Sequence, residues 1–254
     1  MHLQRLWQVN RADNRVVERL KRELGLSRVM ACILANRGIM TPQEANEFLY
    51  AGLSRLKDPL EIPGVKEGAA RIFDAVKKEQ QILVYGDYDV DGITATALLT
   101  GILRQLGAKA EYYIPSRLEE GYGLNRQALL LAREKGTELI ISVDCGISSV
   151  QETAFAAQLG LDVVITDHHQ PPCQLPQARA IINPKLSIAA APWSELAGVG
   201  VALKLGQAVA TLFDCCKLYE EYLDLAALGT IADIVPLKGE NRILVREGLS
   251  YLNS

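Results

Sequence analysis

The 254-residue sequence lacks the features of several protein classes. A membrane-spanning helix needs about 20 consecutive apolar residues, and no stretch approaches that length, so we expect no membrane contact. The first 20 residues carry scattered charges and have no apolar core of the signal-peptide kind. No CxxC pair occurs, which argues against a zinc ribbon and for free thiols in a reducing cytoplasm. The five cysteines are Cys32, Cys145, Cys173, Cys215 and Cys216.

Strongly charged tracts are also missing. The net charge is only −3, and no run of Lys and Arg is present, so charge alone does not predict binding to nucleic acid. The distribution is more informative, because residues 1–80 carry 14 Lys/Arg against 10 Asp/Glu, while residues 81–254 carry 13 against 20. Bound divalent cations would offset part of the acidic excess in the second region. The mildly basic first region could touch a phosphate backbone.

The order of apolar patterns predicts the fold class. Residues 1–80 form a helical segment, with helices expected at 14–24, at 42–49 after a Thr41–Glu44 capping box, and at 65–78. From residue 81, short apolar runs at 82–85, 110–114, 139–143, 162–166 and 180–182 alternate with helical stretches at 93–106, 125–135 and 149–159. Further helices are expected within 196–213, 217–229 and 241–252. This alternation is typical of an α/β fold with a mostly parallel five-stranded sheet and helices on both faces.

The sequence Val84-Tyr-Gly-Asp-Tyr-Asp-Val-Asp-Gly92 directly follows the first expected strand and places three carboxylates at alternate positions. A calcium loop of the EF-hand type would need a Glu at its twelfth position, which is Leu98 here. That alternative is therefore excluded. A solvated acidic turn stays open from this segment alone, so the interpretation depends on ligands elsewhere in the chain.

Other metal-type side chains follow two further strands. Asp144 comes after the third strand, and Asp167-His168-His169 follows the fourth. Because the carboxyl ends of parallel strands meet at one edge of a sheet, we expect these side chains to converge there. Carboxylates combined with imidazole suit Mn²⁺ or Mg²⁺ better than zinc. The number of candidate ligands exceeds the need of one ion and indicates a two-metal site, although Asp144 could also cap a helix.

Four ordered stretches make the interpretation more specific: VYGDYDVDG, VDCGIS, TDHH and, near residue 233, GTIADIVPL. Together they resemble the motifs of the DHH phosphoesterase superfamily, and within it the RecJ group of single-strand-specific 5′→3′ exonucleases. The stretches IPSR at 114–117, EGYGL at 120–124 and LAGVGVA at 196–202 support the resemblance, which covers nearly the whole chain.

The resemblance implies roles for individual positions. His169 would contact the scissile phosphate, and Asp167 would orient the histidines as a catalytic-site carboxylate. Many superfamily members carry His where this chain has Tyr85, which implies altered metal affinity there, with Asp87 as the compensating ligand. The implied ligands of two Mn²⁺ or Mg²⁺ ions are Asp87, Asp89, Asp91, Asp144, His168 and Asp233.

The resemblance also implies a function and a domain layout. Residues 81–254 would form a DHH phosphoesterase domain that ends before the DHH-associated and OB domains of the group. The expected activity is a metal-dependent 5′→3′ exonuclease on single-stranded DNA in repair and recombination, in the cytoplasm, with single-strand-binding or repair proteins as partners. The alternatives are an oligonucleotide, cyclic-dinucleotide or pyrophosphate hydrolase, and an inactive scaffold fragment.

Four further expectations concern residues outside the ligand set. Arg117 is expected to bind a backbone phosphate, with a surface salt bridge as the alternative, and Tyr122 to stack on a base or to pack its loop. Gly198-Val199-Gly200 does not complete a dinucleotide-binding pattern, because Leu203 occupies the third glycine's place, and we expect a helix start there. Lys204 is expected to be a solvated helix residue.

Overall fold

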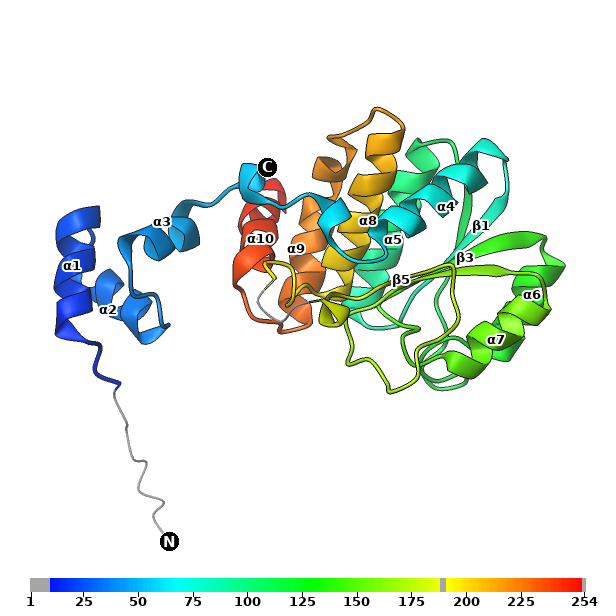
Figure 1. Cartoon of the computed structure of the whole chain (residues 1–254), viewed down its shortest axis with the longest axis horizontal. Coiled ribbons are helices and arrows are strands. Elements are labelled where there is room, and N and C mark those ends of the chain that lie inside the picture. Colours follow the sequence, from blue (N-terminus) through cyan, green and yellow to red (C-terminus); the bar gives the residue numbers. More distant parts are fainter. Residues whose placement is uncertain (1–9, 188–190, 253–254) are drawn as a thin grey trace, which may run out of the picture. The chain divides into compact units, whose positions relative to one another are not determined.

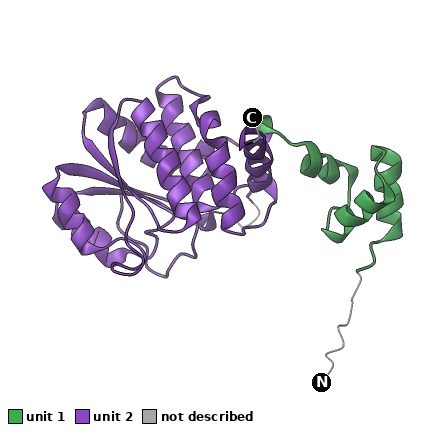
Figure 2. Ribbon diagram, turned by 180° about the vertical axis from the view of Figure 1, so that it is seen from behind, with its two compact units in different colours: residues 1–54 green, residues 55–254 purple. Residues whose placement is uncertain are grey.

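The computed structural model describes residues 10–187 and 191–252. The chain divides into two compact units, residues 1–54 and 55–254 (Figure 2). The sequence analysis expected a division at residue 80, where the pattern changes from helices alone to alternating strands and helices, and this division stays a prediction. The helix α4 (Val65–Lys77), which lies before residue 80, packs on α8 (Gly198–Leu212) inside the second unit.

The first unit consists of three short helices, α1 (Asn14–Leu24), α2 (Arg28–Asn36) and α3 (Pro42–Tyr50). The predicted capping box at Thr41 and Glu44 is present and begins α3. The sequence analysis did not single out α2, whose N-terminus is capped by Ser27. A small core of Val17, Leu20, Ala31, Leu34 and Ala45 holds the three helices together.

The second unit is built on a five-stranded sheet in which every strand is parallel to its neighbours. Each predicted strand is found within two residues of its expected bounds, so the predicted fold class is confirmed. The order β2-β1-β3-β4-β5 reverses direction between β1 and β3, and ligands bind at such a switch point in open α/β sheets. The strands are β1 (Gln81–Tyr85), β2 (Lys109–Tyr113), β3 (Thr137–Val143), β4 (Asp162–Thr166) and β5 (Ala180–Ile182).

Helices cover both faces of this sheet, which explains why the strands are continuous apolar runs. One face carries α4, α5 (Val90–Gln105) and α8, and the other carries α6 (Arg126–Glu134) and α7 (Val150–Gln158) (Figure 1). Outside the first layer, α9 (Leu223–Ala232) packs against α5 and α8, and α10 (Gly239–Leu252) packs against α9. In the ranges 10–187 and 191–252, no helix has the length and apolar character needed to cross a bilayer.

One prediction about α8 is wrong. Lys204 is not solvated but only 1% exposed. Its ammonium group lies 2.9 Å from the Glu240 carboxylate and donates a hydrogen bond to the Lys57 carbonyl at 2.8 Å. The reason is that α8 packs on the sheet, on α4 and α5, and on α9. The Lys204 side chain is therefore buried together with the apolar side chains of the helix. The nearly uniform apolar sequence of α8 was the available signal, because a helix that is apolar on all sides is buried.

Candidate metal centre

The candidate metal centre lies at the edge of the sheet where the parallel strands end. Val143 in β3 pairs with Thr166 in β4, so Asp144 and Asp167, the next residues, leave the sheet side by side. Asp144 has a left-handed backbone with φ 60°, a conformation that Asp tolerates better than most residues. This turn directs the chain away from the sheet directly after the strand.

Two carboxylates of the acidic stretch after β1 have different roles. Asp89 caps α5 by accepting a hydrogen bond from the Gly92 amide at 2.9 Å. Asp91 lies in the first turn of α5 and is 1% exposed. Its carboxylate accepts hydrogen bonds from the backbone amides of Gly198 at 2.6 Å and Val199 at 2.8 Å. The N-terminus of α8 therefore orients and stabilises this carboxylate.

The contact with α8 was missed by the sequence analysis, although the predicted helix start at Gly198 is confirmed. A Cβ atom on Gly198 would lie 2.4 Å from Asp144 Oδ1, so only glycine fits this close approach. A Cβ on Gly229 of α9 would similarly meet Asp91 Oδ1 at 2.9 Å. Glycines at both helices thus allow the backbone to pack directly on the acidic side chains.

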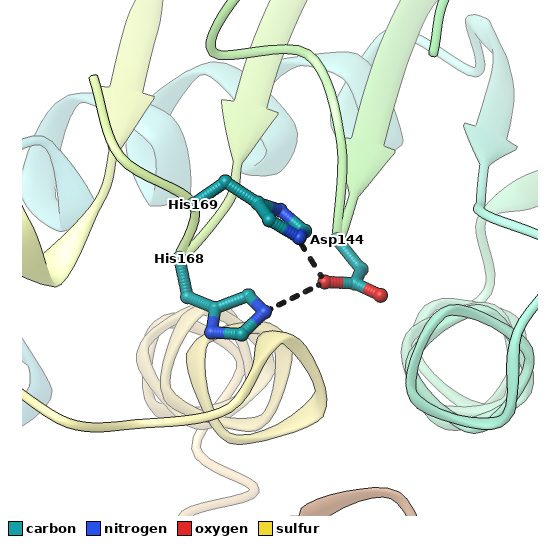
Figure 3. Close-up of side chains that lie close together, drawn as sticks. All are labelled: Asp144, His168 and His169. Atoms are coloured by element: carbon teal, nitrogen blue, oxygen red, sulfur yellow. Dashed lines mark ion pairs between the residues drawn. The ribbon is translucent and has the colours of Figure 1, made fainter. Parts of the chain in front are cut away.

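His168 lies at the centre of the cluster. Its Nε2 atom is 3.2 Å from Asp144 Oδ1, 3.6 Å from Asp233 Oδ2 and 3.8 Å from Asp91 Oδ2. Figure 3 shows His168 and His169 both turned toward Asp144, whose Oδ1 is 4.0 Å from His169 Nδ1. Asp91 in the first turn of α5 thereby meets residues that follow β3, β4 and α9.

The structure brings all six predicted ligands together. Within each of two separate groups, the potential ligand atoms lie within 4.8 Å of one another. A third, overlapping group combines Asp144 with both histidines. The number of separate groups fits a pair of ions, while the ligand role of each residue stays a prediction. The two groups are Asp91, His168 and Asp233, and Asp87, Asp89 and Asp144.

The electrostatics of the cluster favour a bound cation. Burial raises the pKa of Asp87, Asp91, Asp144 and Asp233, and neighbouring carboxylates raise each of them further. Among the described residues, the buried atoms without a hydrogen-bond partner include Asp144 Oδ1, His168 Nε2 and Asp233 Oδ2. Carboxylates close together and unpaired are stabilised by a divalent ion. The residues therefore fit Mn²⁺ or Mg²⁺.

Asp167 is not among these ligand atoms, because both oxygens of its carboxylate accept hydrogen bonds within the protein. It accepts hydrogen bonds from the backbone amides of His168 at 2.7 Å and His169 at 3.0 Å, and from His169 Nδ1 at 2.8 Å. The Ile147 amide donates to its other oxygen at 2.9 Å. Burial opposes the charge on Asp167, but these hydrogen bonds outweigh it and lower the pKa.

The two histidines consequently differ. The hydrogen bond to Asp167 raises the pKa of His169 to about 9, although burial opposes the rise. This ring is positively charged at neutral pH and has its Nδ1 occupied. Burial lowers the pKa of His168, which keeps it neutral and suited to binding a metal. The side chain of His169 is 47% exposed and that of His168 10% exposed, so His169 is the one that a ligand can reach.

Of the remaining predicted residues, Tyr122 lies beside the cluster. The Tyr122 hydroxyl is 3.1 Å from His169 Nδ1 and 3.3 Å from the Asp144 carbonyl oxygen. The guanidinium of Arg117 lies 5.4 Å from the centre of the Tyr88 ring. Tyr85 belongs to a hydrophobic core cluster with Leu124, Leu129 and Ile140. It is fully buried, and its hydroxyl donates to the Gly123 carbonyl.

Comparison with known families agrees with this geometry. The family model described as "DHH family, N-terminal domain" matches residues 81–230, which is more than half of the chain. The chain belongs to the DHH family.

Within the family, the chain is similar to proteins named single-stranded-DNA-specific exonuclease RecJ. The Bacillus subtilis (strain 168) relative is 45% identical over 97% of this chain and 31% of its own length. The Escherichia coli (strain K12) relative is 39% identical over 87% of this chain and 40% of its own length. The chain thus spans about a third of the length of these curated relatives.

Two solved structures are also similar. The Thermus thermophilus RecJ in complex with Mn²⁺ superposes with a TM-score of 0.81 at 32% identity, over 96% of this chain and 34% of that one. An exonuclease RecJ bound to manganese has a TM-score of 0.71 at 39% identity, over 77% of this chain and 49% of that one.

Proposed function

We propose that this chain is the catalytic part of a metal-dependent phosphodiesterase that degrades single-stranded DNA from its 5′ end in repair and recombination. The convergence of unpaired ligand atoms from Asp144, His168 and Asp233 at the switch point of the sheet carries this proposal. The names of the relatives support the substrate, and the metals of the solved structures support Mn²⁺ or Mg²⁺.

Six side chains would hold the ions: Asp91, His168 and Asp233 in one group, and Asp87, Asp89 and Asp144 in the other. A pair of ions held there would supply a hydroxide nucleophile and would stabilise the attacking and leaving oxygens of a phosphoryl displacement. Asp144 is the candidate bridge, because its Oδ1 atom lies 3.2 Å from His168 Nε2 of the other group.

The cationic side chains beside this centre suit a phosphate group. His169 is held by Asp167 in a charged form at neutral pH, so it would neutralise charge on the scissile phosphate. Arg117 would bind a neighbouring backbone phosphate. Tyr122, 46% exposed beside His169, would be in reach of the terminal nucleotide.

The cellular setting is part of the same proposal. Single-stranded DNA would be the partner, with single-strand-binding or repair proteins delivering it. All five cysteines are free thiols, which supports a reducing compartment such as the cytoplasm.

The test uses the purified chain with Mn²⁺ and single-stranded DNA labelled at its 5′ or its 3′ end. The expected result is early release of the 5′ label as a mononucleotide, no release after EDTA treatment, and loss of activity in Asp144→Asn. Early release of the 3′ label would overturn the polarity.

The same preparation separates the alternatives. Hydrolysis of pyrophosphate or dinucleotides, but not of DNA, would overturn the substrate and retain a phosphoesterase. No hydrolysis of any of these and no Mn²⁺ binding by calorimetry would favour the inactive scaffold.

A further inference from the structure

Tyr85 is a polar residue at a buried position where the family resemblance led us to expect an effect on the metal. It is the last residue of β1 and is 0% exposed. Its ring packs with Leu124, Leu129 and Ile140 in the core on the α6 and α7 face of the sheet. The side chain therefore leaves the strand toward this core.

The hydroxyl of Tyr85 has both of its hydrogen-bonding capacities satisfied. It donates to the Gly123 carbonyl at 2.9 Å and accepts from Asn125 Nδ2 at 3.1 Å. Burial raises the pKa of this phenol well above its ordinary value, so it stays a neutral donor. Without it, the buried Gly123 carbonyl would lose this donor, and the Asn125 amide would keep only its bond to Glu120.

These bonds belong to a network that holds the loop over residues 114–125. Asn125 also donates to Glu120 at 3.0 Å and caps α6 by accepting from the Ala128 amide at 2.7 Å. Glu120 in turn accepts from the Tyr113 hydroxyl and, at 2.8 Å, from the Ser116 amide. The loop is thus tied to the ends of β1 and β2 and to the start of α6.

Tyr122 is the residue of this loop that reaches the candidate centre. It stands between Gly121 and Gly123, whose φ values of 79° and 86° form a turn that other residues rarely adopt. Its ring meets the His169 ring edge-on at a centroid distance of 5.7 Å. Because His169 Nδ1 donates to Asp167, the Tyr122 hydroxyl donates to the Asp144 carbonyl at 3.3 Å.

We propose that Tyr85 is a positioning residue for His169, acting through the Gly123 carbonyl and the adjacent Tyr122 side chain. The Tyr85 hydroxyl fixes the peptide between Gly123 and Leu124, one residue after Tyr122. Tyr122 then limits the rotation of the His169 ring, and Asp167 holds the ring through its Nδ1 atom. The inference deepens the proposed function and rests on it, because His169 is the group that would meet the phosphate. In this chain the residue at position 85 serves the histidine rather than the metal.

The first test is spectroscopic and needs no activity. The chain contains only three histidines, His2, His168 and His169, so ring-labelled histidine gives a spectrum that His2→Ala and His169→Ala assign. In the Mg²⁺-loaded protein, Tyr85→Phe is expected to shift and broaden the His169 ring signals and to leave those of His168 in place. Tyr222→Phe is the matched control, because it removes a hydroxyl hydrogen-bonded to Gln105 and should leave both rings unchanged.

The second test is kinetic. Tyr85→Phe is expected to lower kcat about tenfold, as loss of an outer-shell partner does, with KM and Mn²⁺ affinity unchanged. Tyr122→Ala is expected to lower kcat at least as much. The double variant should have the same kcat as Tyr122→Ala, because Tyr85 acts on His169 only through the Tyr122 side chain.

Several outcomes would overturn the proposal. Weaker Mn²⁺ binding in Tyr85→Phe would mean that Tyr85 acts on the metal site. If the losses in kcat of the two single variants add up in the double variant, Tyr85 contributes only to the stability of the fold. If Tyr85→Phe does not fold, Asn125→Ser replaces it. The serine keeps a capping oxygen for α6, removes the amide bonds to Tyr85 and Glu120, and should shift the His169 signals in the same way. An absence of DNA hydrolysis by the unmodified chain would contradict the proposed function, while the ring spectra would still test the positioning.

Discussion

Two buried polar clusters in the second unit differ in how their charges are compensated. Lys204 and Glu240 are 1% and 2% exposed, and the ammonium group lies 2.9 Å from the carboxylate. At the candidate metal centre, Asp91 and Asp144 are each 1% exposed, and the nearest basic group is the neutral ring of His168. The first cluster contains its own counter-charge, whereas the second contains an excess of like charge.

This difference separates a structural cluster from a binding site. Glu240 also accepts a hydrogen bond from the Lys57 amide at 2.6 Å, so the pair ties the start of α10 and residue 57 to the middle of α8. Glu240 Oε2 has no hydrogen bond but lies 2.9 Å from the Lys204 ammonium group. At the metal centre, Asp144 Oδ1, His168 Nε2 and Asp233 Oδ2 lack a hydrogen bond, and the two carboxylate oxygens have only the neutral His168 ring beside them at 3.2 and 3.6 Å. A buried cluster that costs folding energy by itself is one that a cation can stabilise.

The largest expected effect is on stability and comes from the paired cluster. Lys204→Met leaves the Glu240 carboxylate buried without a counter-charge, and breaking a buried pair in this way costs about 3–5 kcal/mol. Urea unfolding of the metal-free protein measures this loss. Exposed Lys66→Met on α4 is the control and should change stability by less than about 0.5 kcal/mol. A similar small loss for Lys204→Met would mean that the pair is not structural.

Asp144→Asn should have the opposite pattern. It removes one of the crowded carboxylates, so the metal-free protein should melt at the same or a higher temperature. Hydrolysis should fall at least about 100-fold, the upper end of the losses for partners of a bound metal. Melting curves and DNA cleavage are measured on one preparation, with Asp74→Asn on α4 as the surface control. A destabilised Asp144→Asn protein with full activity would mean that Asp144 has a structural role, like Lys204 and Glu240, and does not bind a metal.

Adding metal should stabilise the protein through the candidate metal centre, whose negative charges have no counter-charge, and not through the Lys204–Glu240 pair. Mn²⁺ at 100 times its dissociation constant is expected to stabilise the native chain by about 2.7 kcal/mol. Differential scanning calorimetry with and without EDTA gives the shift in Tm. Lys204→Met should show the same increment from its lower starting point, whereas Asp144→Asn should lose most of it. Equal shifts in all three proteins would place the ion outside the candidate centre.

A smaller effect is expected where α8 meets the centre. Gly198→Ala would place a Cβ atom 2.4 Å from Asp144 Oδ1, so the carboxylate has to move, and Mn²⁺ affinity should fall about tenfold. Gly200→Ala is the matched control, since its Cβ would meet only the flexible end of Leu196 at 2.9 Å. Titration calorimetry compares the two variants. Equal affinities would show that the contact between Gly198 and Asp144 does not shape the centre.

Much of this fold and of its candidate site could be predicted from sequence because local signals agreed. Short apolar runs alternating with helical patterns predicted the parallel sheet, and strand bounds matched within two residues. Parallel strands end at one edge, so Asp89, Asp144 and His168 were expected to meet before any distance was known. Asp233 is different, because it follows the helix α9 and only the family motif indicated it.

The contacts that sequence reasoning missed are long-range. The amides of Gly198 and Val199 bind Asp91 across 107 and 108 positions, and Lys204 meets the Lys57 carbonyl across 147. The Tyr85 hydroxyl finds Gly123 on a loop 38 residues away. Periodicity and capping rules describe neighbours within one helix or strand. They do not predict which helices and loops pack on one another.

The sequence by itself determined the class of the protein: the alternation of strands and helices, the acidic and histidine motifs at the strand ends, and the chemistry of those side chains. Only the tertiary structure decided how the charges are compensated. Packing placed Lys204 beside Glu240, and it brought the carboxylates of Asp91, Asp144 and Asp233 around the neutral His168. Burial strengthens electrostatic interactions by excluding water, so the same residue types became a structural pair in one place and a candidate cation site in the other.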